Sequence, residues 1–172
     1  MRCRLTTPRL ILRPLSPADT PAIVAALSDW EVTRWLTSVP FPYGEADARW
    51  FIEGPAADPE QAHFAIDHAG AMVGVVSVKP DLGYWLSPAN HRNGLMGEAV
   101  DAALDWRFAR DPSPVASGHI EGNAASRRLL LARGFKDGAV ETVARRGDGT
   151  PVPVQRMSLT RDRWREYRHG TA

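Results

Sequence analysis

A glycine-containing turn between a strand pattern and a helix pattern constrains this fold more than any other stretch of the chain. The segment GYWLSPANHRNGLMGEA, residues 83–99, begins with strand-forming residues, crosses a polar turn and becomes helical around Gly94 and Gly97. Glycine leaves the backbone N–H groups of a helix start uncovered, and these unpaired groups lie at the positive end of the helix dipole. The turn therefore predicts an anion site, to which Arg92 could add a bidentate contact with phosphate oxygens. The pattern alone also allows a simpler interpretation, in which the glycines only permit a tight turn.

Strand and helix patterns alternate along the rest of the chain, which predicts an α/β (α+β) fold. The predicted strands are 9–15, 63–67, 72–78, 82–87, 114–120, 139–146 and 152–159. The predicted helices are 16–27, 44–54, 97–110, 123–133 and a terminal helix within 161–170. The second to fourth strands follow one another through short hairpin connections, so the centre of the fold is an antiparallel meander.

Composition excludes several classes of protein. The chain has 172 residues, 44% hydrophobic and 24% charged, which predicts one domain spanning residues 1–172. Its formal net charge of +1 gives no strong attraction to nucleic acid or to an acidic membrane surface. Cys3, the single cysteine, permits no internal disulfide, and no apolar run approaches the roughly 18 residues of a membrane span. The first ten residues have no apolar signal core, and the five histidines have no metal-ligand spacing. We expect a cytoplasmic protein with no nucleic-acid partner, no membrane partner and no metal.

A second motif narrows the function. The segment GNAASRRLLLARGF, residues 122–135, places Asn123, Ser126, Gly134 and Phe135 at fixed intervals. With this motif the chain resembles the GCN5-related N-acetyltransferase (GNAT) superfamily, in its RimJ/RimL-like branch. That family carries a Q/R-x-x-G-x-G/A turn for the coenzyme A pyrophosphate, followed by an N-x-x-S helix that ends in a Gly-Phe pair.

The resemblance extends over essentially the whole chain but departs from the family pattern in the glycine turn. The stretches TPRLILRPLSPAD, SDWEVTRWL and MSLTRDRW also look like this branch. In the turn, His91 stands where the family has glutamine or arginine, and Met96 stands where it has a small residue.

The resemblance implies a fold and a cosubstrate site. The expected GNAT fold has a single mixed, mostly antiparallel central sheet flanked by helices, and this sheet splays between the fourth and fifth strands to admit the pantetheine arm. The glycine turn would bind the pyrophosphate of acetyl-CoA, and the end of the fourth strand would pair with the pantetheine arm. The implied cofactor-binding residues are Trp85, Leu86, Arg92, Asn93, Gly94, Leu95, Met96, Gly97, Asn123 and Ser126.

The implied activity is transfer of the acetyl group of acetyl-CoA directly to a primary amine. The acceptor would be a protein or peptide N-terminal α-amine, or else a small amine or amino acid. The alternative is a non-catalytic acyl-CoA-binding or regulatory protein with the same fold, suggested by His91, Met96 and Leu130. Homodimers are common in the family, so a homodimer is compatible with the resemblance.

Ser126 is the candidate residue that protonates the leaving thiolate or donates a hydrogen bond to it. Many superfamily members use a tyrosine seven residues after the motif asparagine, where this chain has Leu130. In the RimJ/RimL-like branch the serine of N-x-x-S is thought to take this role. Ser126 has the alternative role of satisfying backbone groups in the first turn of its helix, and Asn123 has the alternative role of N-cap.

The general base has two candidates. His119 lies on the fifth predicted strand, shares a face with Glu121 and can titrate in the useful pH range. Glu31 lies in a segment that resembles the family's substrate-side loop. Tyr84 and Trp85 are neighbours on one strand and point to opposite faces, so we expect at most one of them to line the cleft.

Overall fold

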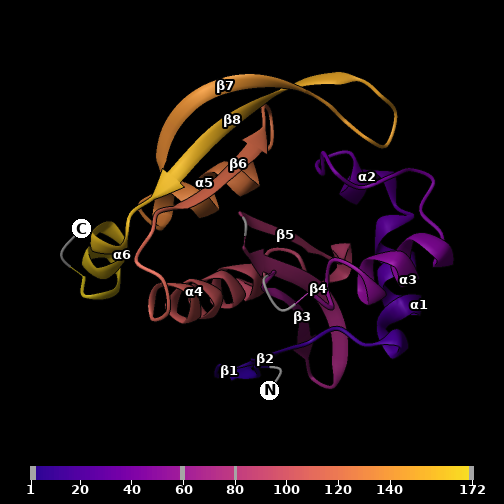
Figure 1. Cartoon of the computed structure of the whole chain (residues 1–172), viewed down its shortest axis with the longest axis horizontal. Helices are drawn as coiled ribbons and strands as arrows, with labels where there is room; N and C mark the ends of the chain where they lie inside the picture. Colours follow the sequence, from indigo (N-terminus) through magenta and orange to yellow (C-terminus); the bar gives the residue numbers. More distant parts are fainter. Residues whose placement is uncertain (1–2, 59–60, 80, 171–172) are drawn as a thin grey trace.

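The computed structural model describes residues 3–58, 61–79 and 81–170, which form two antiparallel sheets with helices packed against them (Figure 1). The strands are β1 Leu5–Thr6, β2 Leu10–Arg13, β3 His63–His68, β4 Ala71–Val78, β5 Leu82–Leu86, β6 Val115–Ile120, β7 Lys136–Ala144 and β8 Pro151–Leu159. The helices are α1 Thr20–Leu27, α2 Trp30–Thr33, α3 Glu45–Glu53, α4 Leu95–Phe108, α5 Ala124–Ala132 and α6 Arg161–Arg168, with short 3-10 turns η1 Pro17–Asp19 and η2 Pro88–Asn90.

The strands hydrogen-bond as two sheets, where the sequence predicts one. The five-stranded sheet has the order β1-β2-β3-β4-β5 and the three-stranded sheet has the order β6-β8-β7. Every ladder among the described strands is antiparallel, which confirms the mostly antiparallel architecture. The sheets divide between β5 and β6, where the Ser117 hydroxyl donates to the Leu82 carbonyl at 2.9 Å. These are the two strands at which the splay is expected, and the splay itself and the single domain over 1–172 stay predictions.

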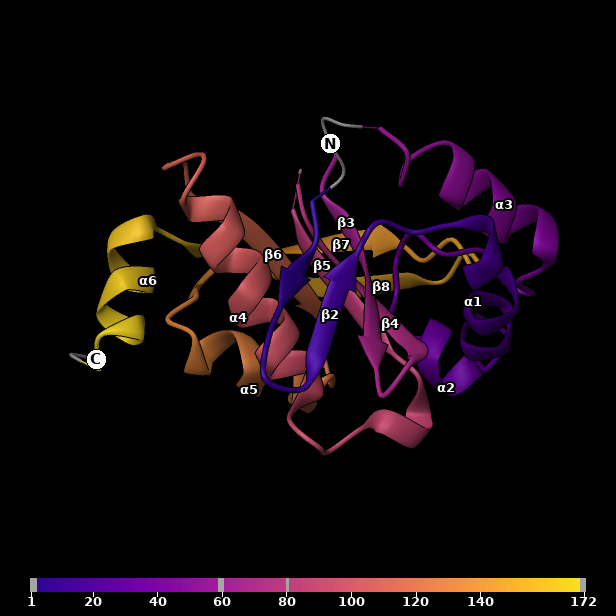
Figure 2. The same cartoon turned by 90° about the horizontal axis from the view of Figure 1, so that it is seen from below.

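The five-stranded sheet is covered on both faces because alternate strand residues point in opposite directions. On one face, Phe64, Val76 and Leu86 join the core that also contains buried residues of α4. On the other face, Ala65 and Val75 join a second core with α1 and α3. Figure 2 shows α4 and the pair α1 and α3 on opposite sides of this sheet. β5 is the edge strand that faces β6, and the core on the α4 side continues past it to buried residues of β6 and β8.

Helix α4 confirms the predicted amphipathic pattern, since Val100, Ala103, Leu104 and Phe108 are all buried. It begins at Leu95 rather than at the predicted Gly97, because Gly94 is the N-cap with a φ of +72°. The remaining helical predictions agree with α1, α3 and α5 to within a few residues. None of the helices in the described ranges combines the length and apolarity that crossing a membrane requires.

Among the described strands and α-helices, two short elements lie outside the predicted set. β1 has two residues and pairs with β2, and α2 forms a single turn inside the stretch that reads as a loop. Neither is long enough to show a period in the sequence. The predicted turn at 79–81 includes Pro80, which lies outside the described residues.

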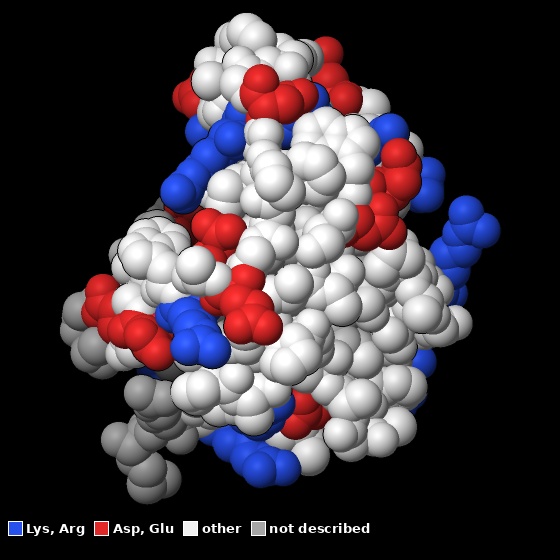
Figure 3. Space-filling view, turned by 90° about the vertical axis from the view of Figure 1, so that its right-hand side faces the viewer, with Lys and Arg blue, Asp and Glu red and all other residues white. Residues whose placement is uncertain are grey.

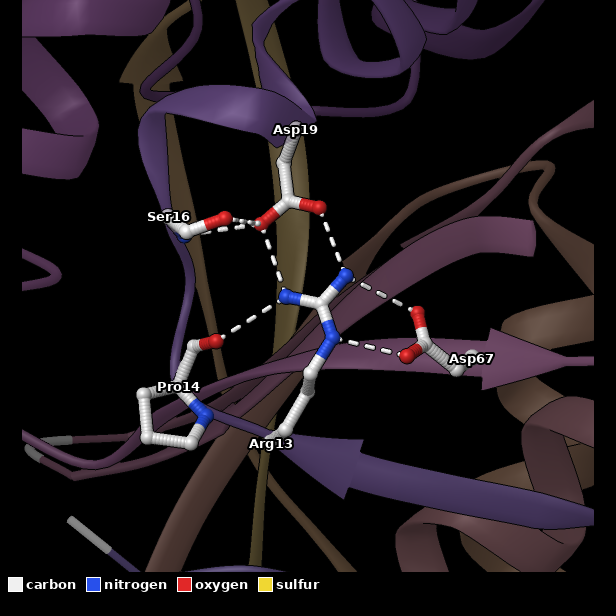
Figure 4. A network of polar contacts seen from close by, with 5 residues as sticks. All are labelled: Arg13, Pro14, Ser16, Asp19 and Asp67. Carbon is white, nitrogen blue, oxygen red and sulfur yellow. Dashed lines mark hydrogen bonds and ion pairs between the residues drawn. The ribbon is translucent and has the colours of Figure 1, made fainter. Parts of the chain in front are cut away.

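Arg13 anchors the start of the helical layer to the sheet (Figure 4). Its guanidinium donates to both oxygens of Asp19 at 2.7 and 2.8 Å and to both oxygens of Asp67 at 2.7 and 3.0 Å. The backbone N–H of Ser16 also donates to Asp19 at 2.7 Å. Burial raises the pKa of Asp19, but the hydrogen bonds from Arg13 and Ser16 outweigh it, so this pKa lies below its ordinary value.

Candidate active site

A cavity of about 1130 Å³ lies where β5, β6 and the first turns of α4 and α5 meet. All but one of the residues predicted for the site line it: Glu31, Trp85, Leu86, Arg92, Gly94, Leu95, Met96, Gly97, His119, Asn123 and Ser126. The exception is Asn93, whose carbonyl oxygen accepts from Arg9 Nη1 at 2.8 Å. The turn therefore directs this part of the Asn93 backbone to Arg9, and the structure does not bring Asn93 to the cavity.

The first turn of α4 presents unpaired N–H groups. No side chain caps it among the described residues, and the first bond of the helix runs from Glu98 N to Gly94 O at 3.2 Å. The N–H groups of residues 95–97 therefore have no acceptor within the helix. Arg92 and Arg128 also line the cavity, so the site can hold an anion such as a pyrophosphate.

Glu98 is the acidic residue in this first turn, and its negative charge is paired with Arg9 from the segment before β2. Arg9 donates to it from Nε at 2.6 Å and from the backbone N–H at 2.9 Å, and the Thr7 hydroxyl donates to it as well. Burial raises the pKa of Glu98, but the hydrogen bonds from Thr7 and Arg9 outweigh it and bring this pKa below its ordinary value. Arg9 thus compensates the Glu98 charge and also stabilises the glycine turn through its hydrogen bond to the Asn93 carbonyl.

The edge of β5 offers backbone hydrogen-bonding groups to the same cavity. Ser87 N–H donates to Val73 O on β4 at 2.8 Å, and successive residues of a strand direct their backbone groups to opposite sides. Tyr84 and Leu86 therefore direct their N–H and C=O groups away from β4. Leu86 O is already occupied, since His91 Nε2 donates to it at 2.8 Å.

The expectation that at most one of Tyr84 and Trp85 lines the cleft is wrong. Their side chains do take opposite faces, because Trp85 packs in the α1 and α3 core whereas Tyr84 packs beside the α4 core. Both residues nevertheless line the large cavity, and both line a second cavity of about 470 Å³. The reason is that β5 is an edge strand and the two cavities meet at it.

Asn123 and Ser126 lie at the start of α5. Asn123 is the N-cap, since its side-chain oxygen accepts from Ser126 N at 3.1 Å, which confirms the N-cap interpretation. Ser126 Oγ lies 2.7 Å from the phenol oxygen of Tyr84. Burial raises the pKa of Tyr84 to about 12, against the opposing effects of the Ser126 hydrogen bond and the positive charge of Arg133. The phenol is therefore neutral at physiological pH.

The two candidate bases have contrasting surroundings. His119 is buried, and its Nδ1 donates to Ile120 O at 3.1 Å, so in the neutral imidazole it is Nε2 that carries the lone pair. That Nε2 is enclosed and has no hydrogen-bond partner among the described residues. Glu31 lies on α2 with its side chain 70% exposed and 3.3 Å from Arg34. Glu121, expected to share a face with His119, lies in the turn after β6, is exposed and is not among the residues that line the cavity.

The smaller cavity lies between β5, α3 and the segment after α2, and the sequence analysis singled out only Tyr84 and Trp85 among its residues. Its walls are mostly apolar and aromatic, and its polar groups include Asp47, His63 and Arg146. His63 Nε2 donates to Gln61 Oε1 at 3.0 Å, and burial lowers the pKa of His63 despite the nearby charge of Asp58. The strand alternation places His63 on the face of Ala65, but no motif marks it. Figure 3 shows the face of the molecule formed around α1, α2 and α3, where acidic and basic side chains are interspersed around a broad uncharged area.

Comparisons with known proteins agree with this geometry. A family model described as an acetyltransferase (GNAT) domain matches residues 9–136. The uncharacterized N-acetyltransferase YoaA of Bacillus subtilis (strain 168) is 29% identical over 177 residues, which cover 92% of this chain and 97% of the relative.

Two solved structures share the fold. A GCN5-related N-acetyltransferase from Brucella melitensis matches with a TM-score of 0.81 at 16% identity, covering 98% of this chain and 83% of that one. An acetyltransferase from Salmonella typhimurium that modifies the N-terminal serine of the 50S ribosomal subunit protein L7/L12 matches with a TM-score of 0.75 at 18% identity, covering 90% of this chain and 96% of that one. The family match spans most of the chain, and we conclude that the chain belongs to the GNAT family of acetyltransferases.

Proposed function

We propose that this chain transfers the acetyl group of acetyl-CoA directly to a primary amine. The observation that carries the proposal is the opening of three features into one cavity: the unpaired first turn of α4, the outward backbone groups of β5 and the Ser126 hydroxyl. Acetyl-CoA supplies an acetyl group already activated as a thioester. The residues of the chain therefore have to bind, orient and stabilise charge, and no covalent enzyme intermediate is required.

Each group around the large cavity has a role in this proposal. The N–H groups of residues 95–97 and the Arg92 side chain bind the pyrophosphate. Tyr84 and Leu86 offer outward backbone groups to the amides of the pantetheine arm. Asn123 holds the first turn of α5 in place through its bond to Ser126 N, and the Ser126 hydroxyl would be available to the sulfur of bound acetyl-CoA.

The smaller cavity is proposed to hold the group attached to the acceptor amine. It meets the large cavity at Tyr84 and Trp85, and its walls are mostly apolar. An α-amine of a peptide, or a small amine or amino acid with an apolar side group, would bury that group here. The Salmonella neighbour acts on a protein N-terminus, so peptide α-amines are the first acceptors to test.

The acceptor amine has to lose a proton before or during attack, and Glu31 and His119 remain the two candidate bases. Glu31 is open to solvent and needs no rearrangement to accept a proton. His119 has a lone pair on Nε2 but needs an opening toward the cavity before it can act.

The experiment that tests this proposal follows binding and turnover in one sample. Acetyl-CoA is titrated into purified protein in a calorimeter, and then peptide, amino acid and amine acceptors are added while free thiol is measured. We expect micromolar binding followed by thiol release with at least one acceptor. Folded protein that releases no thiol with any amine in a broad panel would contradict the proposal.

A non-catalytic acyl-CoA-binding role is the second candidate. It is favoured by the bond from His91 to Leu86 O, which occupies one of the outward carbonyls of β5. Binding of acetyl-CoA without thiol release would support this role, and detectable acetyl transfer would remove it. Homodimer formation stays a prediction for either candidate.

A further inference from the structure

Two hydroxyl groups meet in the wall of the large cavity. Tyr84 comes from β5 and Ser126 from the first turn of α5, and their oxygens are 2.7 Å apart. Both residues line the cavity, and neither hydroxyl makes another hydrogen bond with the described residues. Ser126 is also held through its backbone, because its N–H donates to Asn123 Oδ1 at 3.1 Å.

The number of protons determines how this pair is arranged. Each hydroxyl has one proton, and the single bond between them uses only one of the two. A phenol is a stronger acid than an aliphatic alcohol and is therefore the better hydrogen-bond donor, whereas the alcohol oxygen is the better acceptor. Tyr84 therefore donates to Ser126 Oγ, and the Ser126 proton is left to point into the cavity.

Resting on the acetyl transfer proposed above, we infer that Tyr84 is a positioning residue that directs the Ser126 hydroxyl at the sulfur of the leaving thiolate and strengthens its hydrogen bond. Donors in a chain polarise one another, so a serine hydroxyl that accepts from a phenol is a better donor than an isolated one. The neighbouring turn of α5 offers no replacement, because Leu130 lies four residues after Ser126, is fully buried and has no hydroxyl.

The chemistry balances with Ser126 as a hydrogen-bond donor. The bond from the amine nitrogen to the carbonyl carbon forms while the carbon–sulfur bond breaks, and its electron pair passes to sulfur. The attacking amine is neutral, its nitrogen loses one proton to a base as the amide forms, and the thiolate later takes one proton from water. Ser126 and Tyr84 keep their own protons and lower the energy of the charge on sulfur.

The kinetic test is a double-mutant cycle. We expect Ser126→Ala to lower kcat roughly 100-fold, the usual effect of removing one donor to a developing anion. We expect Tyr84→Phe to lower kcat roughly tenfold with the KM for acetyl-CoA unchanged. Because Tyr84 acts through Ser126, adding Tyr84→Phe to Ser126→Ala should cause no further loss. Independent, multiplying losses would overturn the inference.

A second measurement does not depend on turnover. CoA is bound to the protein, and the thiol of the bound CoA is titrated by its ultraviolet absorbance. Hydrogen bonding to the thiolate lowers a thiol pKa, so we expect a pKa about one unit lower in the wild-type complex than with Ser126→Ala or Tyr84→Phe. Tyr167→Phe is the matched control, since Tyr167 lies on α6 and donates to Asp101 at 3.4 Å, away from the cavity. It should titrate like the wild type.

The outcomes separate this inference from the proposed function. A wild type that binds CoA but acetylates nothing would overturn acetyl transfer, and the thiol titration would still decide whether the hydroxyl pair reaches the sulfur. Full activity in Tyr84→Phe, or equal thiol pKa values in the three complexes, would overturn the hydroxyl pair alone. Absence of CoA binding by folded wild-type protein would overturn both. Circular dichroism and calorimetric affinity for CoA show whether each variant keeps its fold and its cavity.

Discussion

The guanidinium of Arg133 occupies the space above Gly97. A Cβ added at Gly97 would lie 2.6 Å from Arg133 Nη2, too close for any real contact. Arg133 is held there because Nε donates to Asp101 at 2.6 Å and Nη1 donates to Leu129 O at 3.0 Å. The glycine is therefore explained by the packing of α5 against α4, in addition to any approach of a ligand.

This contact predicts that the effect of Gly97→Ala depends on residue 133. In the wild type, alanine displaces the guanidinium, and the cost of this displacement exceeds the gain in helix propensity, so we expect a net loss of about 1 kcal/mol in the free energy of unfolding. In an Arg133→Ala background the space is open, and the same change should stabilise by about 1 kcal/mol. Urea unfolding of the four proteins measures both values. The same sign in both backgrounds would show that Arg133 does not cause the effect.

Substitution of Arg92 tests the anion site in the glycine turn more directly than substitution of Gly94. Gly94 has a φ of +72°, so any side chain there strains the turn itself, and loss of binding would not identify the cause. Arg92 has a φ of +63°, which asparagine tolerates well. We expect Arg92→Asn to weaken CoA binding roughly tenfold and to reduce its salt dependence, because a charged contact to phosphate is lost.

The matched control for Arg92 is Arg165→Ala, which also removes one positive charge. Arg165 lies on α6 with its side chain 58% exposed and 3.9 Å from Asp162. Calorimetric titration with CoA at two salt concentrations should give this variant the wild-type affinity. Equal weakening in both variants would mean that net charge, and not the turn, attracts the ligand.

Removing His91 should favour binding. Its Nε2 occupies Leu86 O, an acceptor on the β5 edge, at 2.8 Å. His91→Ala frees this carbonyl for an amide N–H of the pantetheine arm, and we expect CoA affinity to rise about threefold. Isothermal titration calorimetry with CoA measures the affinity of the wild type and of His91→Ala. A fall in affinity would show that the imidazole itself contacts the ligand.

Asp19 predicts a defined acid sensitivity. Its pKa is lowered in the folded protein, so its stabilisation is complete above the unfolded pKa and is lost as the pH falls through the folded pKa. Asp19→Asn should lower the free energy of unfolding by about 2 kcal/mol at pH 7, because Arg13 loses a buried charged partner.

The same substitution should flatten the loss of stability as the pH falls below about 5. Urea unfolding at several pH values measures this difference. Asp162→Asn is the control, because the Asp162 side chain is 86% exposed, and it should follow the wild type. A parallel pH profile for Asp19→Asn and the wild type would contradict the role of the Arg13 network.

Much of the fold could be predicted because its signals are local. Helix α4 shows a clear apolar period in Val100, Ala103, Leu104 and Phe108, and Gly134 takes the positive φ of +87° expected of a helix C-cap glycine. The turn between β3 and β4 has positive φ at Ala69 and Gly70, as a two-residue hairpin requires. The division into two sheets has no such local signal, because it depends on whether β5 and β6 pair across the fold.

The candidate site likewise has features that the local sequence predicts and features that depend on tertiary contacts. Sequence alone determined the glycine turn, the Asn123 cap and the family to which the chain belongs, because each is encoded by residues at fixed short spacings. Only the tertiary structure decided that Tyr84 meets Ser126, that Arg133 covers Gly97, that Asn93 faces Arg9 and that His63 lines a second cavity. These contacts join residues up to 84 positions apart, and packing of distant elements, which no local pattern records, brings them together.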